Sequence, residues 1–253
     1  MLKNAVKTVF RMAGYKISKF SRPTVSFNNP PGNYQIPDQE FYRPLFSPWY
    51  NNGTGEFKQM MREISGRTLV SPDRCFLLYL LAKQSARRNG HFYECGVYKG
   101  GTARLLANIL AVYRICPHQK LCLFDSFAGM PDVNPENDLH RKGDFADTTL
   151  DEARQNIGFD FLVEYNKGLI PQTFKGKDAD VISLAHIDVD IYQSVLDCCE
   201  FIYPRLLTGG IMVFDDYGFP TCPGARKAVD EFFENKPEIP IVIPSGQAII
   251  FKI

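Results

Sequence analysis

The sequence has almost no net charge and lacks any long apolar run. Its 29 Lys and Arg residues nearly balance 28 Asp and Glu residues, which leaves a formal net charge of +1. A chain without a broad positive field has no general electrostatic reason to bind nucleic acid. The segment 1–20, MLKNAVKTVFRMAGYKISKF, contains no uninterrupted apolar core of signal-peptide length, and no later segment is long enough to span a bilayer. We therefore expect no secretion signal, no transmembrane segment and no nucleic-acid partner.

The cysteines form neither a ligand pattern nor a disulfide pattern. There are seven, and several lie inside apolar runs, but their spacing matches neither a zinc site nor the framework of a small secreted domain. The composition is otherwise that of an ordinary globular protein, with 45% apolar and 23% charged residues among 253. That length suffices for one large domain with an added arm. These features favour a reduced, cytoplasmic setting.

The first 66 residues differ in composition from the rest. Basic and apolar residues mix in 1–20, which suits either a simple packing helix or peripheral contact with an anionic membrane surface. Residues 22–56 are rich in Pro, Asn, Gly and aromatics, and a loop of that length is commonly a lid, an arm or an oligomer contact. Trp49 and Tyr50 would either line the acceptor site or pack against a neighbouring subunit. We expect an N-terminal helix and arm at 1–66, a main domain at 67–253, and a homo-oligomer.

Strand-like and helix-like segments alternate after residue 70. Ser71 followed by Pro72 predicts the start of a helix that covers roughly 72–88. Predicted strands cover 91–97, 121–127, 161–167, 181–190, 209–217, 239–244 and 248–253, with further helices at 101–114, 149–157, 192–206 and 225–235. Only SGQ joins the last two strands, so they should pair as an antiparallel hairpin. The expected fold is an α/β domain with a seven-stranded, mostly parallel sheet whose last strand is antiparallel.

Glycines and acids follow the first two predicted strands, and ligands bind at the carboxyl ends of strands in open α/β sheets. The stretch ECGVYKGGT places Glu94 at a strand end and Gly96, Gly100 and Gly101 in the next turn. It is not the dinucleotide-binding G-x-G-x-x-G pattern, and no Lys-Ser/Thr pair follows to hold a phosphate. Asp125 ends the second strand, where doubly wound folds often place an acid that binds ribose. The turn suits a nucleoside, or else the glycines are structural and Asp125 is a turn residue.

Two pairs of aspartates follow later strands. HIDVDIYQSV carries Asp188 and Asp190 one residue apart, so on a strand both would point to the same side. VFDDYG ends the next strand with Asp215 and Asp216, and a right-handed crossover would make the two strands neighbours. Clustered carboxylates repel one another unless a cation or a proton is shared. An all-oxygen set suits Mg²⁺, Mn²⁺ or Ca²⁺ better than zinc; the alternative is that these are solvated acids at loop ends.

Several stretches resemble the macrocin O-methyltransferase (TylF/MycF/NovP-like) family. They are FYECGVYKGGTARLLA, LFDSFAGMP, KGDFADTTLDEARQNI, HIDVDIYQSVLDCCEFIYPRLLTGGIMVFDDYG and the tail PSGQAIIFKI. The resemblance runs in order from about Arg67 to the C-terminus, whereas the first sixty-odd residues match only loosely. It implies a Rossmann-like class I methyltransferase that uses S-adenosylmethionine and Mg²⁺ to methylate a sugar hydroxyl on a natural product or glycan.

The resemblance also implies roles for individual residues. Asp188, Asp215 and Asp216 would bind the metal, and Asp190 would be the general base. The cofactor site would be formed by Thr68, Glu94, Gly96, Gly100, Gly101, Thr102, Asp125 and Ser126. His140 falls in a segment that resembles a mobile lid, and a lone histidine is more often a surface residue than a catalyst, so we assign it no role. The acceptor is not specified by any of these motifs.

The implied chemistry makes use of the acids. A sugar hydroxyl has a high pKa and attacks a sulfonium methyl slowly, so a metal must acidify it while a carboxylate removes the proton. Three alternatives are a catechol-type O-methyltransferase with a similar acid trio, a non-catalytic domain that binds the cofactor, and an NAD-dependent oxidoreductase. The missing pyrophosphate motif disfavours the oxidoreductase. The intact acid set disfavours the non-catalytic domain, since clustered carboxylates cost stability without a metal.

Overall fold

The computed structural model describes residues 55–253. The basic segment at 1–20, nearly all of the predicted arm at 22–56, and the aromatic pair Trp49 and Tyr50 lie outside the described residues. No helix within 55–253 is both long enough and apolar enough to cross a membrane. All seven cysteines of the chain fall in the described range, and all are free thiols.

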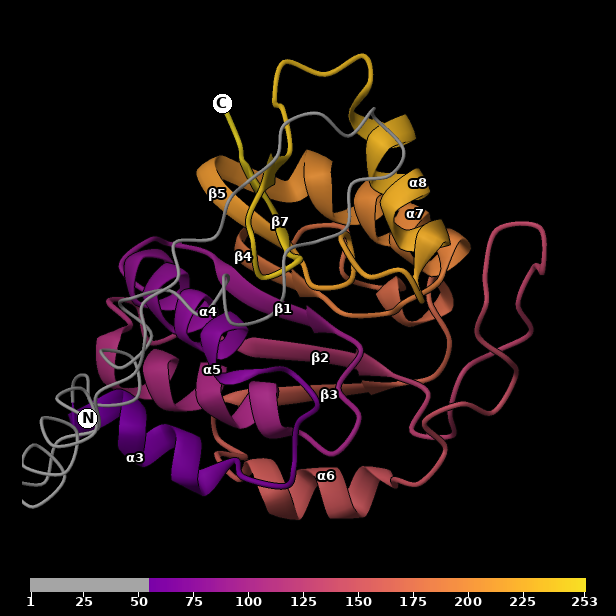
Figure 1. Cartoon of the computed structure of the whole chain (residues 1–253). Helices are drawn as coiled ribbons and strands as arrows, with labels where there is room; N and C mark the ends of the chain where they lie inside the picture. Colours follow the sequence, from indigo (N-terminus) through magenta and orange to yellow (C-terminus); the bar gives the residue numbers. More distant parts are fainter. Residues whose placement is uncertain (1–54) are drawn as a thin grey trace, which may run out of the picture. The chain divides into compact units, whose positions relative to one another are not determined.

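A seven-stranded sheet forms the centre of the domain, with strand order β3-β2-β1-β4-β5-β7-β6 (Figure 1). The strands are β1 (His91–Cys95), β2 (Leu121–Asp125), β3 (Val163–Lys167), β4 (Ile182–Ile187), β5 (Leu206–Phe214), β6 (Ile241–Val242) and β7 (Ala248–Phe251). Strands β1 to β5 are parallel, and β7 runs antiparallel to both β5 and β6. The predicted mostly parallel sheet, with its final antiparallel hairpin, is confirmed.

Helices cover both faces of the sheet (Figure 1). One face carries α3 (Gly55–Glu63), α4 (Pro72–Ser85), α5 (Gly101–Tyr113) and α6 (Leu150–Ile157), and the other carries α7 (Tyr192–Ile202) and α8 (Pro223–Phe233). Two short 3₁₀ helices are η1 (Gln172–Phe174) and η2 (Tyr203–Arg205). Helix α3 has no counterpart among the predicted helices. It joins the domain because Phe57 packs against Phe76 and Tyr79 of α4, with ring centroids 4.9 and 5.3 Å apart.

Alternating side chains along the strands build a separate core on each face. In β1, Phe92 points to the core shared with α4 and α5, whereas Tyr93 and Cys95 point to the core under α7 and α8. In β4, Leu184 points to the core shared with α4 and α5, and Ala185 points to the core under α7 and α8. Strands that are buried on both faces have nearly continuous apolar sequences, as in these two segments. The loops at the carboxyl edge are therefore anchored on a rigid, fully covered sheet.

The start of α4 delivers a buried arginine to this edge. Ser71 is the N-cap and Pro72 the first helical residue, as predicted. The Ser71 side chain makes no cap bond to the helix backbone, and its Oγ instead accepts a hydrogen bond from Nε of Arg74 (3.1 Å). The carbonyl of Leu69 accepts a second bond from Arg74 Nη2 (3.2 Å). Arg74 is thereby held in one orientation, with its remaining nitrogen, Nη1, paired with Asp215 directly after β5.

Strand β4 is shorter than predicted. It ends at Ile187, although the N–H of Asp188 still donates to the carbonyl of Cys95 (2.9 Å). Asp190 adopts the left-handed backbone conformation (φ 58°), and its N–H donates to Oδ2 of Asp216 (3.0 Å). The prediction that Asp188 and Asp190 share one face of a strand is therefore wrong. The turn separates the two carboxylates into different groups of side chains.

Candidate active site

A cavity of about 290 Å³ opens at the carboxyl ends of β1, β2, β4 and β5. All five aspartates singled out from the sequence line it: Asp125, Asp188, Asp190, Asp215 and Asp216. Apolar parts of its wall come from residues such as Val70, Phe124, Met130, Phe145 and Ile170. This edge is where open α/β sheets bind ligands. The topology thus collects acids that are far apart in the sequence into one site.

Asp188, Asp215 and Asp216 form an acidic cluster. Each offers a carboxylate oxygen, and these oxygens lie within 4.8 Å of one another. Burial, and then the charges of neighbouring carboxylates, raise the pKa of Asp188 and of Asp216 well above the usual aspartate range. Protein groups thus leave much of the negative charge on these two residues uncompensated.

Asp215 differs because donors surround it. Its Oδ2 is paired with Nη1 of Arg74, and its Oδ1 accepts a hydrogen bond from Nε2 of Gln247 (2.8 Å). Nε2 of His186 lies 3.5 Å from the same Oδ1. Burial raises the pKa of Asp215, but the contacts with His186 and Arg74 outweigh burial and lower it. Asp215 is therefore the ionised and most firmly held member of the acidic cluster.

His186 connects the acidic cluster to Glu94. Both side chains are fully buried, and Nδ1 of His186 lies 2.9 Å from Oε1 of Glu94. Burial lowers the pKa of His186, but the contacts with Asp215 and Glu94 raise it well above the usual histidine range, which places an imidazolium between two carboxylates. Oε2 of Glu94 is buried without a hydrogen-bond partner. Glu94 does not line the cavity. It holds His186, which in turn contacts Asp215 of the acidic cluster.

Five of the residues predicted to hold the cofactor line the cavity: Thr68, Gly96, Thr102, Asp125 and Ser126. Oδ2 of Asp125 accepts hydrogen bonds from the N–H groups of Val97 (2.6 Å) and Tyr98 (3.0 Å), and its Oδ1 accepts one from Phe127 (2.6 Å). Asp125 thus ties the turn after β1 to the turn after β2. A carboxylate offers about four lone-pair sites, so Asp125 can still accept about one further bond, at Oδ1, from a ligand in the cavity.

Gly100 and Gly101 lie outside the cavity lining and serve packing. Gly100 has φ +83°, and a Cβ there would meet the side chain of Ile157 at 2.6 Å. A Cβ on Gly101 would meet the Cβ of Thr68 at 2.6 Å, and the Gly101 N–H donates to the carbonyl of Arg67 (3.0 Å). This close approach places Thr68 beside the start of α5.

Gly96 is required by the contact between β1 and the turn after β4. Its φ is +84°, and a Cβ would lie 1.8 Å from the carbonyl oxygen of Asp188. We expect Gly96→Ala to lower the melting temperature and to displace Asp188. Gly176→Ala is the matched control, because Gly176 also has φ +84° and a Cβ there meets nothing within 4 Å. Gly176→Ala should lower the free energy of unfolding by only about 1–2 kcal/mol, the cost of a left-handed backbone conformation for a residue with a Cβ. Equal losses of thermal stability in the two variants would contradict the proposed constraint at Asp188.

Asp190 belongs to a second group, with His140 and Cys222. Nε2 of His140 lies 3.7 Å from Oδ1 of Asp190, and Sγ of Cys222 lies 3.5 Å from each of these atoms. Burial raises the pKa of Asp190, partly offset by the charge of His140. His140, to which the sequence analysis assigned no role, has a half-buried side chain that lines the cavity.

Four site residues were missed by sequence reasoning: Arg74, His186, Cys222 and Gln247. His186 and Gln247 lie within stretches that had already been singled out, and for His186 a polar residue inside an apolar strand was an available signal. Arg74 and Cys222 carry no such signal. Their positions depend on how α4 and α8 pack against the sheet.

Comparison with known proteins places this geometry in a family. Residues 81–243 match the macrocin-O-methyltransferase (TylF) family. A demethyldecarbamoylnovobiocin O-methyltransferase from Streptomyces niveus is 30% identical over 154 residues, which are 56% of this chain and 58% of the relative. An 8-demethyl-8-(2,3-dimethoxy-alpha-L-rhamnosyl)-tetracenomycin-C 4'-O-methyltransferase from Streptomyces olivaceus is 27% identical over 154 residues, which are again 56% of this chain and 58% of the relative. The solved structure of the O-methyltransferase NovP is 25% identical, with a TM-score of 0.66 over 74% of this chain and 82% of that chain.

The chain spans less than two thirds of the length of the curated relatives that it matches. The family match, however, covers more than half of this chain and includes β1 to β5, whose carboxyl ends carry the aspartates of the cavity. The chain belongs to the macrocin O-methyltransferase (TylF) family.

Proposed function

We propose that the protein transfers a methyl group from S-adenosylmethionine to a hydroxyl of a sugar moiety, with Mg²⁺ at the acidic cluster. One observation carries the proposal: a single cavity contains the acidic cluster and also the turn after β1 with Asp125. A methyltransferase must hold its methyl donor and its acceptor side by side, in line for transfer. The cavity offers a place for each at the ends of neighbouring strands.

The acidic cluster fits a hard cation. Its three carboxylates supply the oxygen ligands that Mg²⁺ prefers. Burial, and then repulsion from neighbouring carboxylates, raises the pKa values of Asp188 and Asp216, and a divalent ion would relieve that repulsion. Asp215 would bind the ion through the carboxylate lone pairs that its bonds with Arg74 and Gln247 leave unused. When bound, the ion would supply Lewis acidity that lowers the pKa of an acceptor hydroxyl.

The other side of the cavity fits the nucleoside and methionine parts of the cofactor. Asp125 and Ser126, at the end of β2, would accept hydrogen bonds from ribose hydroxyls. Gly96 in the turn after β1, Thr102 in the first turn of α5 and Thr68 in the segment before α4 would contact the methionine part. Glu94, Gly100 and Gly101 would contribute indirectly, by holding His186 and by fixing the turn.

Asp190 would accept the proton of the acceptor hydroxyl. It lines the cavity next to the acidic cluster, and the bond from its N–H to Asp216 fixes the turn that carries it. Its pKa is raised by burial, and a base whose pKa lies closer to the working pH removes a proton more effectively. Asp190 and Asp188 thus take different roles although they are two residues apart.

A sugar acceptor is supported by the relatives. The Streptomyces olivaceus relative acts on a tetracenomycin that carries a rhamnosyl group, according to its name. That relative and the novobiocin-related enzyme are both O-methyltransferases, and each aligns with this chain over 154 residues. We infer that the acceptor here is a glycoside or glycan rather than a free aromatic diol.

A methyl-transfer screen tests the proposal. The full-length protein is incubated with S-adenosylmethionine that carries a labelled methyl group and with rhamnosides, other deoxyhexosides and catechols, in Mg²⁺ or in EDTA. We expect label on a sugar acceptor in Mg²⁺, and almost none in EDTA because the hydroxyl is no longer acidified. Transfer to catechols alone would favour the catechol-type alternative. Calorimetric binding of NAD without binding of S-adenosylmethionine would contradict the methyltransferase proposal altogether.

A further inference from the structure

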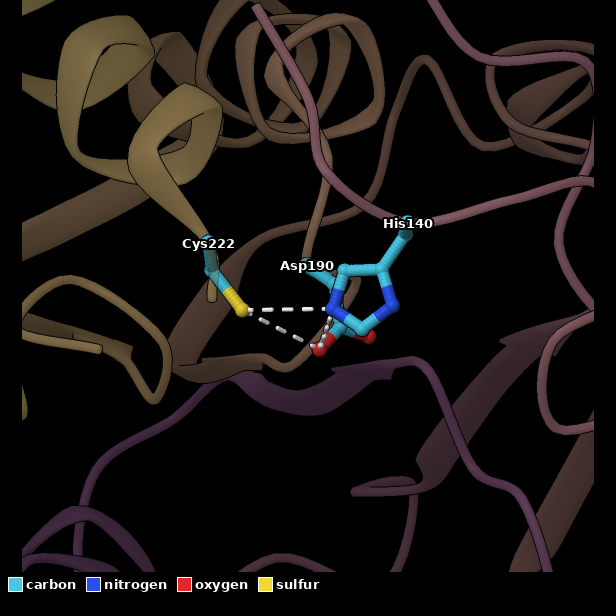
Figure 2. A group of neighbouring side chains, drawn as sticks. All are labelled: His140, Asp190 and Cys222. Atoms are coloured by element: carbon cyan, nitrogen blue, oxygen red, sulfur yellow. Dashed lines mark hydrogen bonds and ion pairs between the residues drawn. The ribbon is translucent and has the colours of Figure 1, made fainter. Parts of the chain in front are cut away.

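His140, Asp190 and Cys222 form a thiol–imidazole–carboxylate group on the cavity wall (Figure 2). The three residues come from the loop between β2 and α6, the turn after β4, and the position that precedes α8. Figure 2 shows the three side chains converging on one point. The distances are 3.5 Å from Sγ to Nε2, 3.5 Å from Sγ to Oδ1 and 3.7 Å from Nε2 to Oδ1.

The two sulfur distances match those between ligands around one small metal ion, whereas the 3.7 Å from Nε2 to Oδ1 is slightly longer. Zinc binds nitrogen at about 2.0–2.1 Å, oxygen at about 2.0–2.2 Å and thiolate sulfur at about 2.3 Å, in a tetrahedral arrangement. Bonds of these lengths at tetrahedral angles place the ligand atoms about 3.4–3.6 Å apart. As a hydrogen bond, the 3.7 Å separation between Nε2 and Oδ1 is too long. The two sulfur distances also suit hydrogen bonds of the Cys222 thiol, and a small ion held by all three atoms would replace these contacts with ligand bonds.

His140 is oriented like a histidine that ligates a metal. Its Nδ1 lies 3.1 Å from Oδ2 of Asp144, and the same oxygen accepts the N–H of Arg141 (2.9 Å). A carboxylate at Nδ1 holds the proton on that nitrogen, so the Nε2 lone pair points to Cys222 and Asp190. Carboxylate–histidine pairs of this kind fix the ring of zinc ligands and increase their basicity.

This group and the acidic cluster favour different ions. The acidic cluster presents only oxygen ligands, whereas His140 and Cys222 add nitrogen and sulfur, which favour Zn²⁺ and related ions over Mg²⁺. All three residues line the cavity, so a fourth ligand position would face the space assigned to the acceptor. Zinc sites with three protein ligands and one open position have this arrangement.

We propose that His140, Asp190 and Cys222 bind a thiophilic divalent ion such as Zn²⁺, and that the bound ion inhibits methyl transfer. On binding, the S–H bond of Cys222 breaks, the sulfur electron pair forms the sulfur–metal bond, and the proton leaves to solvent. The lone pair of Asp190 is then held by the ion and can no longer accept the proton of the acceptor. The inhibition rests on the proposed function, whereas the binding of the ion does not.

Cobalt(II) distinguishes this site from the acidic cluster, because only a thiolate ligand gives the near-ultraviolet sulfur-to-cobalt charge-transfer band. We expect the metal-stripped full-length protein to develop this band in excess Mg²⁺ and to lose it when Zn²⁺ displaces the cobalt. Cys222→Ser and His140→Ala should both lack the band, with folding confirmed by circular dichroism. Cys116→Ser removes a half-buried thiol outside the cavity lining and should keep it. Absence of the band from the wild type, or its survival in Cys222→Ser, would overturn the site.

Zinc titration of the methyl-transfer reaction then tests the inhibition. At saturating Mg²⁺, added Zn²⁺ should lower the wild-type rate as the site fills, whereas Cys222→Ser should keep its own zinc-free rate. Zinc binding with an unchanged wild-type rate would overturn the inhibitory role. If no acceptor is methylated under any condition, the proposed function fails, while the cobalt spectrum still decides the metal site.

Discussion

Asp190→Asn is expected to lower the turnover number of methyl transfer by roughly 10²–10⁴-fold, the usual contribution of a general base. Asparagine has nearly the same size and cannot accept the proton of the acceptor hydroxyl. The affinity for S-adenosylmethionine should change little, because none of the residues proposed to hold the cofactor lies in the turn after β4. Steady-state rates on the sugar acceptor and calorimetric cofactor binding together measure the two quantities.

Asp188→Asn is the matched comparison, since it makes the same chemical change two residues away in the acidic cluster. It should raise the Mg²⁺ concentration needed for half-maximal activity, and excess Mg²⁺ should recover part of the rate. No concentration of Mg²⁺ should rescue Asp190→Asn. Rescue of Asp190→Asn but not of Asp188→Asn would exchange the two roles. Full activity in both variants would contradict the catalytic interpretation of this turn.

The fold was predictable because short local sequence patterns identify its strands and helices. Strands such as β1 and β4 are short apolar runs, each followed by a helix with apolar residues at helical spacing. The turn between β6 and β7 is too short for a crossover, so the antiparallel hairpin followed from length alone. The end of β4 was misplaced, because alternation along HIDVD does not reveal that Asp190 turns into the left-handed region, which aspartate tolerates better than most residues.

The acids of the cavity were predictable from their positions after strands, but their electrostatic partners were not. Arg74 of α4 lies 141 residues before Asp215 in the sequence, and this pairing exists only once α4 has packed beside β5. Gln247 reaches the same carboxylate from the last hairpin. Neither partner has a sequence pattern of its own. Local patterns therefore give the proposed ligand residues, whereas tertiary packing decides which carboxylates are neutralised by the protein and which would remain available to a cation.

His186→Leu is expected to lower the free energy of unfolding of the metal-free protein by about 3–5 kcal/mol, the usual cost of removing one partner of a buried ion pair. The imidazole is fully buried between Glu94 and Asp215. Without it, Glu94 would have two buried oxygens with no donor, since its Oε2 already has none. Asp215 would keep Arg74 and Gln247. Urea unfolding of both proteins in EDTA measures the difference.

The double variant Glu94→Leu/His186→Leu separates this charge effect from a loss of packing. Replacing both partners by apolar groups leaves no unpaired carboxylate at position 94, so the double variant should be more stable than His186→Leu alone. The pH dependence gives a second check. Contacts with Asp215 and Glu94 raise the pKa of His186, so its stabilisation is complete below the unfolded value of about 6.5 and is lost as the pH rises through the higher folded-state value. The stability difference between wild type and His186→Leu should therefore narrow on the alkaline side. A difference that stays constant with pH, together with a double variant no more stable than the single one, would show that His186 acts by packing alone.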